Sequence, residues 1–334
     1  MTSELSAGMV GLGWMGGQHL EVLGRLKGIK VTAVCDSDQD RAREVAARLK
    51  AESYGSWQDL LERARPDVLW VCTPPGAHRE PVVSALKRGV HVYLEKPIAR
   101  TVEDGAAIVS AAASSSAVCA VGYQWHALDL VERLRAELEG QAVGLMVAVS
   151  VGPTQERPWF LQRAQGGGNL LERGSHQVDL VRALAGEVVA VQVAASAVPL
   201  ARASAPARGD IEDAAGMLLR LRHGGVAVTV VGWLKDGQPG RYSLDVLATD
   251  ATVRLNLDPD FTLDGVSRGR PVSARAARHP LESSVNRFLE AVRAGDPTRV
   301  ACPPSDALRT LAVVAACERA LASGEQVAVD FPPV

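Results

Sequence analysis

The sequence has no long uncharged apolar segment and no concentration of charge of one sign. No run reaches the roughly 18 apolar residues of a membrane span, and residues 1–7 do not lead from a basic segment into a long apolar one. The formal net charge is −2 at pH 7, and the arginine clusters are interrupted by alanine and glutamate. These absences argue against membrane and nucleic-acid partners, so we expect a cytoplasmic protein that binds small molecules.

Closely spaced cysteines are also lacking. The five cysteines are scattered along the chain and form no CxxC pair. Several lie in apolar runs, where a thiol packs as a small hydrophobic group. We therefore expect reduced thiols throughout, and the cysteine spacing predicts no metal site.

Lysine is scarce, with six residues against 30 arginines. An arginine side chain does not lose its proton in proteins, whereas a lysine amine can do so in a partly apolar setting. A lysine beside a binding motif is therefore informative here, and Lys96 is in that position.

The order of apolar segments predicts two domains. Up to Gly122, short apolar runs alternate with helical segments, as in a parallel sheet covered by helices. We predict an α/β doubly wound Rossmann domain over residues 1–122 and an α+β domain with an open, largely antiparallel sheet over residues 123–334. The expected strands of the second domain are 144–151, 188–197, 214–221, 227–233, 242–248 and 251–255. A large sheet with one helix-covered side must cover its other side, so we expect this sheet to form an oligomer interface.

A glycine motif connects the first predicted strand to the first helix. The segment Gly11-Leu12-Gly13-Trp14-Met15-Gly16 fits GxGxxG, and Asp36 ends the next strand about 20 residues later. Glycines allow a close approach of pyrophosphate to the helix N-terminus, and the aspartate can accept hydrogen bonds from a ribose diol. This carboxylate favours NAD over NADP, although Arg41 keeps NADP possible, and a purely structural turn is the alternative. The expected cofactor contacts are Gly11, Gly13, Trp14, Met15, Gly16, Asp36, Ser37 and Arg41.

Two further motifs follow the next strands of the predicted sheet. Thr73-Pro74 comes after one strand and Glu95-Lys96-Pro97 after another, so both are expected at the edge where ligands bind in open α/β folds. Pro97 biases Lys96 toward an extended backbone. We expect Lys96 near the nicotinamide, with an ordinary surface lysine as the alternative. Cofactor contacts expected from these motifs are Thr73, Pro74, His78, Glu95 and Lys96.

The predicted helix 169–184 carries three titratable side chains on an otherwise apolar stripe. Glu172 and His176 are four residues apart, and Asp179 follows three residues later. The preceding Gly166-Gly167-Gly168 is expected to form a flexible, anion-tolerant turn. A ligand-facing stripe is one interpretation; a surface stripe or a metal site of these three side chains are the alternatives.

Together these motifs resemble the glucose-fructose oxidoreductase/inositol dehydrogenase family, Gfo/Idh/MocA, over essentially the whole chain. The resemblance implies NAD or NADP as cofactor, dimers or tetramers, and sugar, inositol or related polyol substrates. This chain departs from the family in two places. Pro75 follows Thr-Pro where Asn is frequent, and Glu172 stands where many members have Asp.

The resulting hypothesis is reversible oxidation of a secondary alcohol of a sugar or polyol by hydride transfer. His176 is the expected base, because its ordinary pKa of about 6.5 suits proton transfer near neutral pH. Lys96 is expected to hold the reacting oxygen, and Glu172 to orient the substrate or Lys96. Further substrate candidates are Gln124, His126, Arg157, Trp159 and Asp179.

Two other functions fit the same residues. One is a catalytically silent dinucleotide sensor, because a fold does not determine a function. The other is a redox-neutral sugar conversion with tightly held NAD. Lys96 and His176 in one chain favour an enzyme over the sensor.

Overall fold

The computed structural model describes residues 4–153, 158–196, 198, 210–235 and 237–333. The chain divides into two compact units. Unit 1 comprises residues 1–127 and 280–308, and unit 2 comprises residues 128–279 and 309–333.

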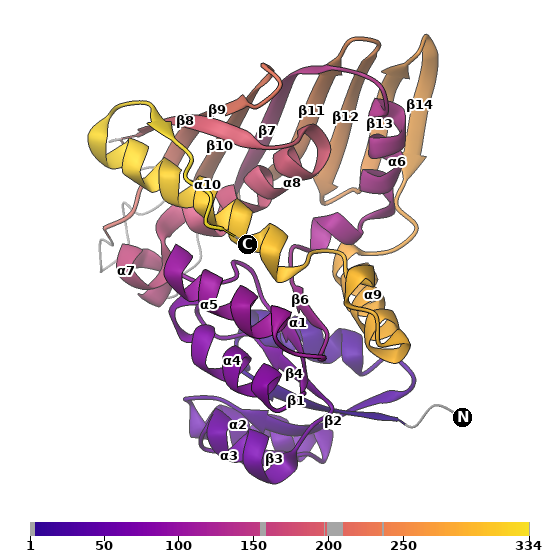
Figure 1. Cartoon of the computed structure of the whole chain (residues 1–334), viewed down its shortest axis with the longest axis vertical. Helices are drawn as coiled ribbons and strands as arrows, with labels where there is room; N and C mark the ends of the chain where they lie inside the picture. Colours follow the sequence, from indigo (N-terminus) through magenta and orange to yellow (C-terminus); the bar gives the residue numbers. More distant parts are fainter. Residues whose placement is uncertain (1–3, 154–157, 197, 199–209, 236, 334) are drawn as a thin grey trace. The chain divides into compact units, whose positions relative to one another are not determined.

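A six-stranded parallel sheet forms the centre of unit 1 (Figure 1). Its order is β3-β2-β1-β4-β5-β6, as in a doubly wound dinucleotide-binding fold. The strands are β1 (Leu5–Val10), β2 (Ile29–Cys35), β3 (Glu52–Tyr54), β4 (Val68–Val71), β5 (His91–Leu94) and β6 (Cys119–Val121). The longer helices are α1 (Trp14–Leu23), α2 (Gln39–Leu49), α4 (Arg79–Lys87), α5 (Val102–Ala113) and α9 (Pro280–Ala294). The short ones are α3 (Trp57–Asp59), η1 (Leu60–Ala64), η2 (Pro75–Ala77), η3 (Gln124–Ala127) and η6 (Pro297–Arg299).

Local sequence explains where these elements begin and why the strands are central. Every residue of β4 is buried, which matches its uninterrupted apolar run and its helix-covered faces. Helix α2 begins at Asp38, whose side chain accepts from the Asp40 and Arg41 N–H groups. Helix α5 begins in the same way at Thr101.

A late segment of the chain belongs to unit 1, although the expected division at residues 122 and 123 places it in the second domain. In α9, the Phe288 ring lies 5.6 Å from Trp70 and 5.4 Å from Tyr93, centroid to centroid. The Tyr93 hydroxyl and Ser284 hydroxyl are 2.8 Å apart. The apolar face of α9 therefore completes the core of unit 1.

Unit 2 is built on a nine-stranded sheet with the order β14-β13-β12-β11-β7-β10-β9-β8-β15. Only the β7–β10 pair is parallel among its described pairs. The strands are β7 (Val143–Pro153), β8 (Val188–Ala195), β9 (Ala214–Leu221), β10 (Val226–Leu234), β11 (Arg241–Ala248), β12 (Ala251–Asp258), β13 (Thr262–Ser267), β14 (Arg270–Arg275) and β15 (Val327–Ala328). The helical segments are α6 (Asp129–Leu138), η4 (Pro158–Leu161), α7 (Arg163–Gly166), η5 (Leu170–Gly174), α8 (Ser175–Ala185) and α10 (Pro304–Ser323), whose first residues belong to unit 1.

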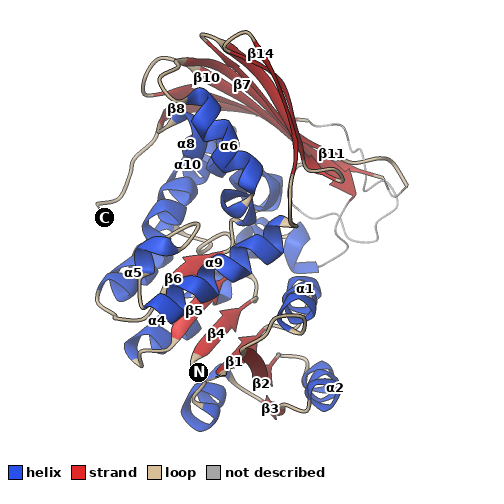
Figure 2. Cartoon of the chain, turned by 90° about the vertical axis from the view of Figure 1, so that its right-hand side faces the viewer, coloured by secondary structure: helices blue, strands red, loops and turns tan. Residues whose placement is uncertain are grey.

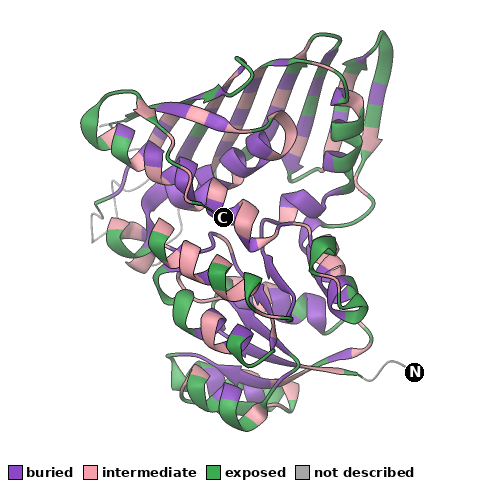
Figure 3. Ribbon diagram, in the orientation of Figure 1, coloured by how far each residue is buried: buried purple, intermediate pink, exposed green. Residues whose placement is uncertain are grey.

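The two faces of this sheet differ in what covers them. Helices α6 and α8 pack on one face (Figure 2), and burial alternates along the strands (Figure 3). The opposite face, which we call the open face, remains partly exposed. It carries Leu145, Val147, Val149, Leu218, Val228, Val230, Leu247 and Val266.

The cysteines and the helices bear on two expectations from the composition. All five cysteines are free, and only Cys72 is not fully buried. None of the helices in the described part of the chain combines the length and apolar character needed to cross a membrane.

Candidate functional site

The three glycines of the motif between β1 and α1 occupy three different environments. Gly11 has φ +91°, and a Cβ there would lie 2.6 Å from the Cys72 carbonyl group. A Cβ on Gly16 would lie 2.3 Å from the Gly11 carbonyl oxygen. At Gly13 a Cβ would meet nothing within 4 Å, and no side chain caps α1 there. The motif thus has a tight turn, a close helix contact and an open N-terminus, which together fit a pyrophosphate.

The carboxylate of Asp36 lies at the end of β2 and fixes this turn. It is 7% exposed, and its Oδ2 accepts from the Leu12 N–H at 2.6 Å. Its Oδ1 accepts from the Asp38 N–H at 2.9 Å and from the Ser37 hydroxyl at 3.4 Å. Arg41 forms an ion pair with it at 3.3 Å.

These contacts leave Asp36 able to serve a ribose. A carboxylate has about four acceptor positions, and the two backbone donors occupy two of them. The Ser37 hydroxyl and the Arg41 guanidinium, both on side chains that a ribose could displace, occupy the other two. The Arg41 side chain is 46% exposed and also pairs with Asp38 at 3.2 Å. The negative charge is thus retained at this position but partly compensated.

The first residues of α1 remain accessible beside the turn. Trp14 is 58% exposed, and Met15 is half-buried. Met15 packs against the apolar core of unit 1, whereas Trp14 is a large apolar side chain on the surface.

Glu95 and Lys96 follow β5 in a buried setting. Glu95 is 5% exposed, and its Oε1 lies 2.7 Å from His19 Nε2. Its Oε2 accepts from the Lys96 N–H at 3.1 Å. Between Val92 and Ala99, Lys96 is the one residue that is not fully buried.

His19 is a partner that sequence reasoning missed. It is fully buried on α1, and its ring meets Tyr93 edge-on at 5.1 Å. The only signal in the sequence is a histidine at a core-facing position of a helix. Its contact with Glu95 ties the glycine-motif helix to the segment that carries Lys96.

The buried ring of His78 connects two loops at the same sheet edge. Its Nδ1 lies 3.0 Å from the Pro97 carbonyl, and its Nε2 lies 2.8 Å from the Thr73 carbonyl. Burial lowers the pKa of His78, and the surrounding carbonyls oppose this effect only in part. With both nitrogens engaged by backbone, His78 positions the loops around Lys96.

Pro75 and Cys72 lie on either side of Thr73 and Pro74 in the sequence. Pro75 is the first residue of η2, where a missing N–H group costs nothing. Burial and the nearby Glu95 raise the pKa of Cys72 well above its ordinary value, so its thiol stays protonated.

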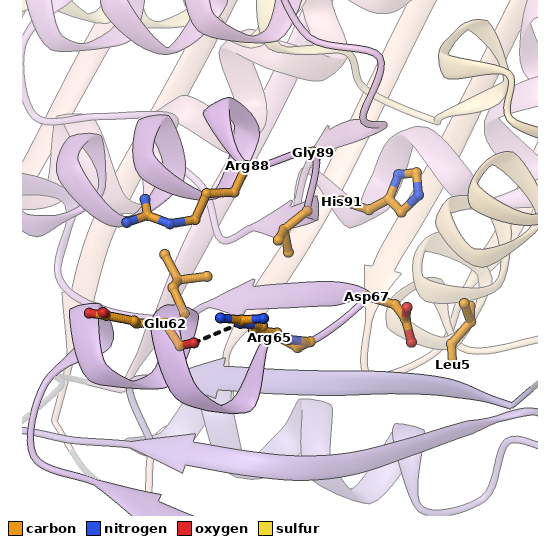
Figure 4. A pocket seen from close by; sticks show the side chains of 10 residues that line it. Leu5, Glu62, Arg65, Asp67, Arg88, Gly89 and His91 are labelled. Atoms are coloured by element: carbon orange, nitrogen blue, oxygen red, sulfur yellow. Dashed lines mark hydrogen bonds between the residues drawn. The ribbon is translucent and has the colours of Figure 1, made fainter.

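These motifs gather at one edge of the parallel sheet. Strands β1, β4 and β5 are adjacent and parallel, and the glycine turn, Thr73 and Lys96 each follow the carboxyl end of one of them. A separate pocket of about 500 Å³ lies at the amino ends of the strands (Figure 4). Its polar side chains include Arg65, Arg88 and Asp67, and none of the candidate residues lines it.

In unit 2, the helix predicted over residues 169–184 is present with an unexpected first turn. Residues Leu170–Gly174 form a π-helix that continues directly into α8. Between Leu170 and Arg182, only Glu172 and His176 are half-buried, and all other residues are buried. These two side chains are therefore the accessible polar groups of the helix, and π-helical segments are frequent at functional sites.

The start of this helix is fixed by buried polar contacts. The Asn169 amide donates to the carbonyls of Glu212 and Asp213 at 3.2 and 3.0 Å. The Trp233 indole N–H donates to the Asn169 side-chain oxygen. Glu212 accepts from the Leu170 N–H at 3.1 Å and pairs with Arg163.

The glycine triplet before the helix is tightly packed, in contrast to the expected flexible, anion-tolerant turn. A Cβ on Gly166 would lie 2.9 Å from the Trp159 carbonyl oxygen. Gly167 has φ +73°, and its Cβ would lie 2.6 Å from that of Leu171. Close packing therefore accounts for these glycines.

Asp179 lies in a buried network on the same helix. It is 1% exposed and accepts from the Thr310 hydroxyl at 3.1 Å. Arg182 donates to the same hydroxyl at 2.7 Å and pairs with Glu187 at 3.0 Å. This network joins α8 to α10 and gives Asp179 a place in the fold.

The remaining substrate candidates have different surroundings. Gln124 is half-buried, and its Oε1 has no hydrogen-bond partner among the described residues. His126 is 4% exposed and contacts the Ala301 carbonyl at 3.1 Å. Trp159 is half-buried against Phe160, and Arg157 lies outside the described residues.

Two family models match successive parts of the chain. Residues 5–123 match the model described as "Oxidoreductase family, NAD-binding Rossmann fold". Residues 128–254 match the "GFO/IDH/MocA C-terminal domain".

Individual proteins match over most of their length. Inositol 2-dehydrogenase 2 of Saccharopolyspora erythraea is 26% identical over 344 residues, 98% of this chain and 96% of that protein. The 2,7-anhydro-N-acetylneuraminate hydratase of Escherichia coli is 26% identical over 266 residues, 75% of this chain and 70% of that protein. The structure of levoglucosan dehydrogenase with NADH and levoglucosan has a TM-score of 0.85 at 19% identity, covering 98% of this chain and 100% of that one.

Proposed function

Because the chain belongs to the Gfo/Idh/MocA oxidoreductase family, we propose that it is an NAD-dependent enzyme that interconverts a secondary alcohol and a ketone of a sugar or cyclitol. Family membership confirms the resemblance stated from the motifs and the NAD-binding Rossmann fold. The observation that carries the proposal is the gathering of the glycine turn, Thr73 and Lys96 at one edge of the unit 1 sheet. Relatives named for inositol and levoglucosan support a polyhydroxylated substrate.

The cofactor proposal rests on Asp36 and α1. The uncapped N-terminus of α1 would hold the pyrophosphate, and the Asp36 carboxylate would accept from the adenosine ribose. Its negative charge disfavours a 2′-phosphate, so we propose NAD rather than NADP. When bound, NAD supplies the hydride acceptor.

Three side chains have separate proposed roles at the reacting alcohol. Lys96 is proposed to donate a hydrogen bond to the reacting hydroxyl oxygen and to stabilise the negative charge that develops on it. His176 is proposed to take the hydroxyl proton as the carbinol loses its hydride, which leaves a ketone. Glu172, the other accessible polar group of its helix, is proposed to orient a second hydroxyl of the substrate. The Gln124 amide, with its unsatisfied buried oxygen, is a further proposed contact.

A polyol and cyclitol panel with NAD or NADP, followed at the absorbance of the reduced nicotinamide, tests this proposal. We expect turnover with NAD. Lys96→Met and His176→Asn should each lower kcat by roughly 100-fold or more, the usual scale for a positioned acid–base group. The exposed residues Lys87 and His279 provide matched controls, and Lys87→Met and His279→Asn should retain activity. Full activity of Lys96→Met at saturating substrate would refute the assignment.

A redox-neutral conversion is the second candidate, because one similar protein is a hydratase. In that case the purified protein would carry NAD that does not exchange, and substrate would be consumed without net reduced cofactor. Mass spectrometry of the released cofactor and product analysis distinguish the two reactions. Exchangeable NAD binding without turnover across the panel would instead favour the sensor.

We also propose that the open face of the unit 2 sheet is buried between copies of the chain. Leu218, Val230, Leu247 and Val266 are 37–49% exposed on this face. Large apolar side chains gathered on one face are typical of subunit interfaces. A homodimer or homotetramer is therefore the proposed assembly.

A further inference from the structure

Three side chains of types that can ligate a metal ion lie close together in unit 1, and none of them has a part in the proposed redox reaction. They are His126, Cys302 and Asp306, and the ligand atom that each offers lies within 4.8 Å of the other two. His126 is in η3, directly after β6, whereas Cys302 and Asp306 lie where the chain enters α10. We propose that these residues bind a divalent transition-metal ion, with zinc as the best match.

The backbone already holds the two segments together. The Val121 N–H donates to the Cys302 carbonyl at 3.0 Å, which places the late segment beside β6. In α10, the Asp306 N–H donates to the Pro303 carbonyl at 3.1 Å. The three ligands are therefore brought together by the fold of unit 1 and not by flexible surface loops.

The orientation of His126 suits a metal ligand. Its Nδ1 lies 3.1 Å from the Ala301 carbonyl oxygen, and a carbonyl can only accept a hydrogen bond. In the neutral ring, Nδ1 therefore carries the proton and Nε2 bears the lone pair. Metal-binding histidines are usually held in this way by a backbone carbonyl or carboxylate.

The donor set indicates the kind of ion. Imidazole nitrogen, thiolate sulfur and carboxylate oxygen together suit zinc, whereas calcium and magnesium prefer oxygen alone. Zinc bonds of about 2.0–2.3 Å imply ligand separations of roughly 3.3–3.8 Å, so a small inward movement would close the site. Three protein ligands leave a fourth position for water.

Two of the three proposed ligands are buried, so a metal ion bound to them would be shielded from solvent. Cys302 is 0% exposed and His126 is 4% exposed, whereas Asp306 is half-buried. The Cys302 thiol lies 3.8 Å from the Pro303 carbonyl, and metal binding would release its proton. The ion would link the end of β6 to the start of α10.

This site differs from the metal alternative considered for α8. Within the described part of the chain, no second group of three such side chains converges. Glu172, His176 and Asp179 do not, because Asp179 is buried in the network with Thr310. The proposed ion is thus independent of the catalytic assignment of His176.

Cobalt(II) titration of the untagged, chelator-treated full chain tests the site. We expect one ion per chain, with thiolate-to-cobalt charge-transfer absorption and the visible bands of a four-coordinate ion. Zinc should displace the cobalt and raise the melting temperature of the protein. These readouts do not depend on NAD or on turnover.

Variants identify the ligands. Cys302→Ser should abolish the charge-transfer absorption and weaken binding by roughly 100-fold, and Asp306→Asn should weaken it by roughly tenfold. Cys317→Ala is the control. It removes a buried thiol inside α10 that is not a proposed ligand, and the variant should keep the spectrum of the original protein. Absence of stoichiometric binding, or an unchanged spectrum in Cys302→Ser, would overturn the proposal. Asp306 is only half-buried, so we expect Asp306→Asn to fold. Its weaker cobalt binding tests the site even if Cys302→Ser does not fold.

Discussion

At the scale of single residues, Asp36 combines a structural and a proposed binding role. Its carboxylate holds the Leu12 N–H of the glycine turn and is paired with Arg41. The same group is proposed to meet the ribose. Asparagine removes the charge but has one acceptor oxygen, so it keeps only one of the two backbone hydrogen bonds that Asp36 accepts.

Asp36→Asn should shift cofactor preference toward NADP. Loss of the negative charge removes the repulsion of a 2′-phosphate and leaves Asp38 as the remaining ion-pair partner of Arg41. The ratio of kcat/KM for NAD to that for NADP should therefore fall by roughly tenfold, about 1.4 kcal/mol. Steady-state kinetics with both cofactors measures the ratio. Arg48→Gln on the exposed side of α2 is the control; an unchanged ratio in Asp36→Asn would contradict the proposed role.

His78 gives a prediction for pH. Burial lowers its pKa in the folded protein below the ordinary value, so below about pH 7 the unfolded chain binds more protons than the folded one. Stability should therefore decrease as the pH falls from 7.5 to 5.5, with a contribution of at most about 1.4 kcal/mol per pH unit from one proton.

His78→Gln isolates this contribution. The variant should be less stable at pH 7.5, because one of two buried contacts is lost, but its melting temperature should depend less on pH. Burial also lowers the pKa of His91, which is present in both proteins and cancels in the comparison. Parallel pH curves for the two proteins would show that another group is responsible.

At the scale of elements, two successive glycines of α1 differ in whether a side chain would fit at their positions. A Cβ on Gly16 would lie 2.3 Å from a backbone oxygen, whereas a Cβ on Gly17 would meet nothing within 4 Å. Packing therefore requires glycine at only one of these positions.

Gly16→Ala should weaken NAD binding by at least roughly tenfold and lower the melting temperature, since the turn and helix must move apart. Gly17→Ala is the matched control and should be neutral or more stable by about 0.5–1 kcal/mol, because alanine favours the helix interior. Calorimetric NAD titration and thermal melting report both effects. Equal behaviour of the two variants would refute the packing argument.

The sequence predicted helices and strands where the apolar periodicity is strong. It did not predict the π-helical segment or the strands with little apolar alternation. The helix containing His176 is present, but its π-helical start depends on Asn169, Glu212 and Trp233, which are far apart in the sequence. Strands β13 and β14 were not predicted, because their short, polar segments carry little apolar alternation.

At the scale of the whole molecule, the open face of the unit 2 sheet supports assembly. Val230 lies on β10 in the middle strands of this face and is 37% exposed. A charge there would have to be desolvated in an interface but would cost little in a monomer.

Val230→Asp should therefore dissociate the proposed oligomer, with a dissociation constant raised by at least roughly 100-fold, about 2.7 kcal/mol. Size-exclusion chromatography with light scattering gives the mass. Arg48→Asp, on the exposed side of α2, is the control and should leave the mass unchanged. A monomeric unmodified protein, or a Val230→Asp variant of unchanged mass, would exclude this interface.

The dinucleotide-binding fold and the family follow from the amino-acid sequence alone, which also singles out the segments proposed to carry the chemistry. These rest on local signals: the spacing of Gly11, Gly16 and Asp36, and the apolar runs before each motif. Such signals reflect short-range backbone geometry, which neighbouring residues specify.

The identity of the distant residues that meet comes from the folded structure. The fold brought α9 back onto the core of unit 1, placed His19 against Glu95, and brought His126 near Cys302 and Asp306. These contacts join residues from 76 positions apart, for His19 and Glu95, to 218 positions apart, for Trp70 and Phe288. They follow from the burial of whole apolar faces, and no local pattern in the sequence records which faces will pack together.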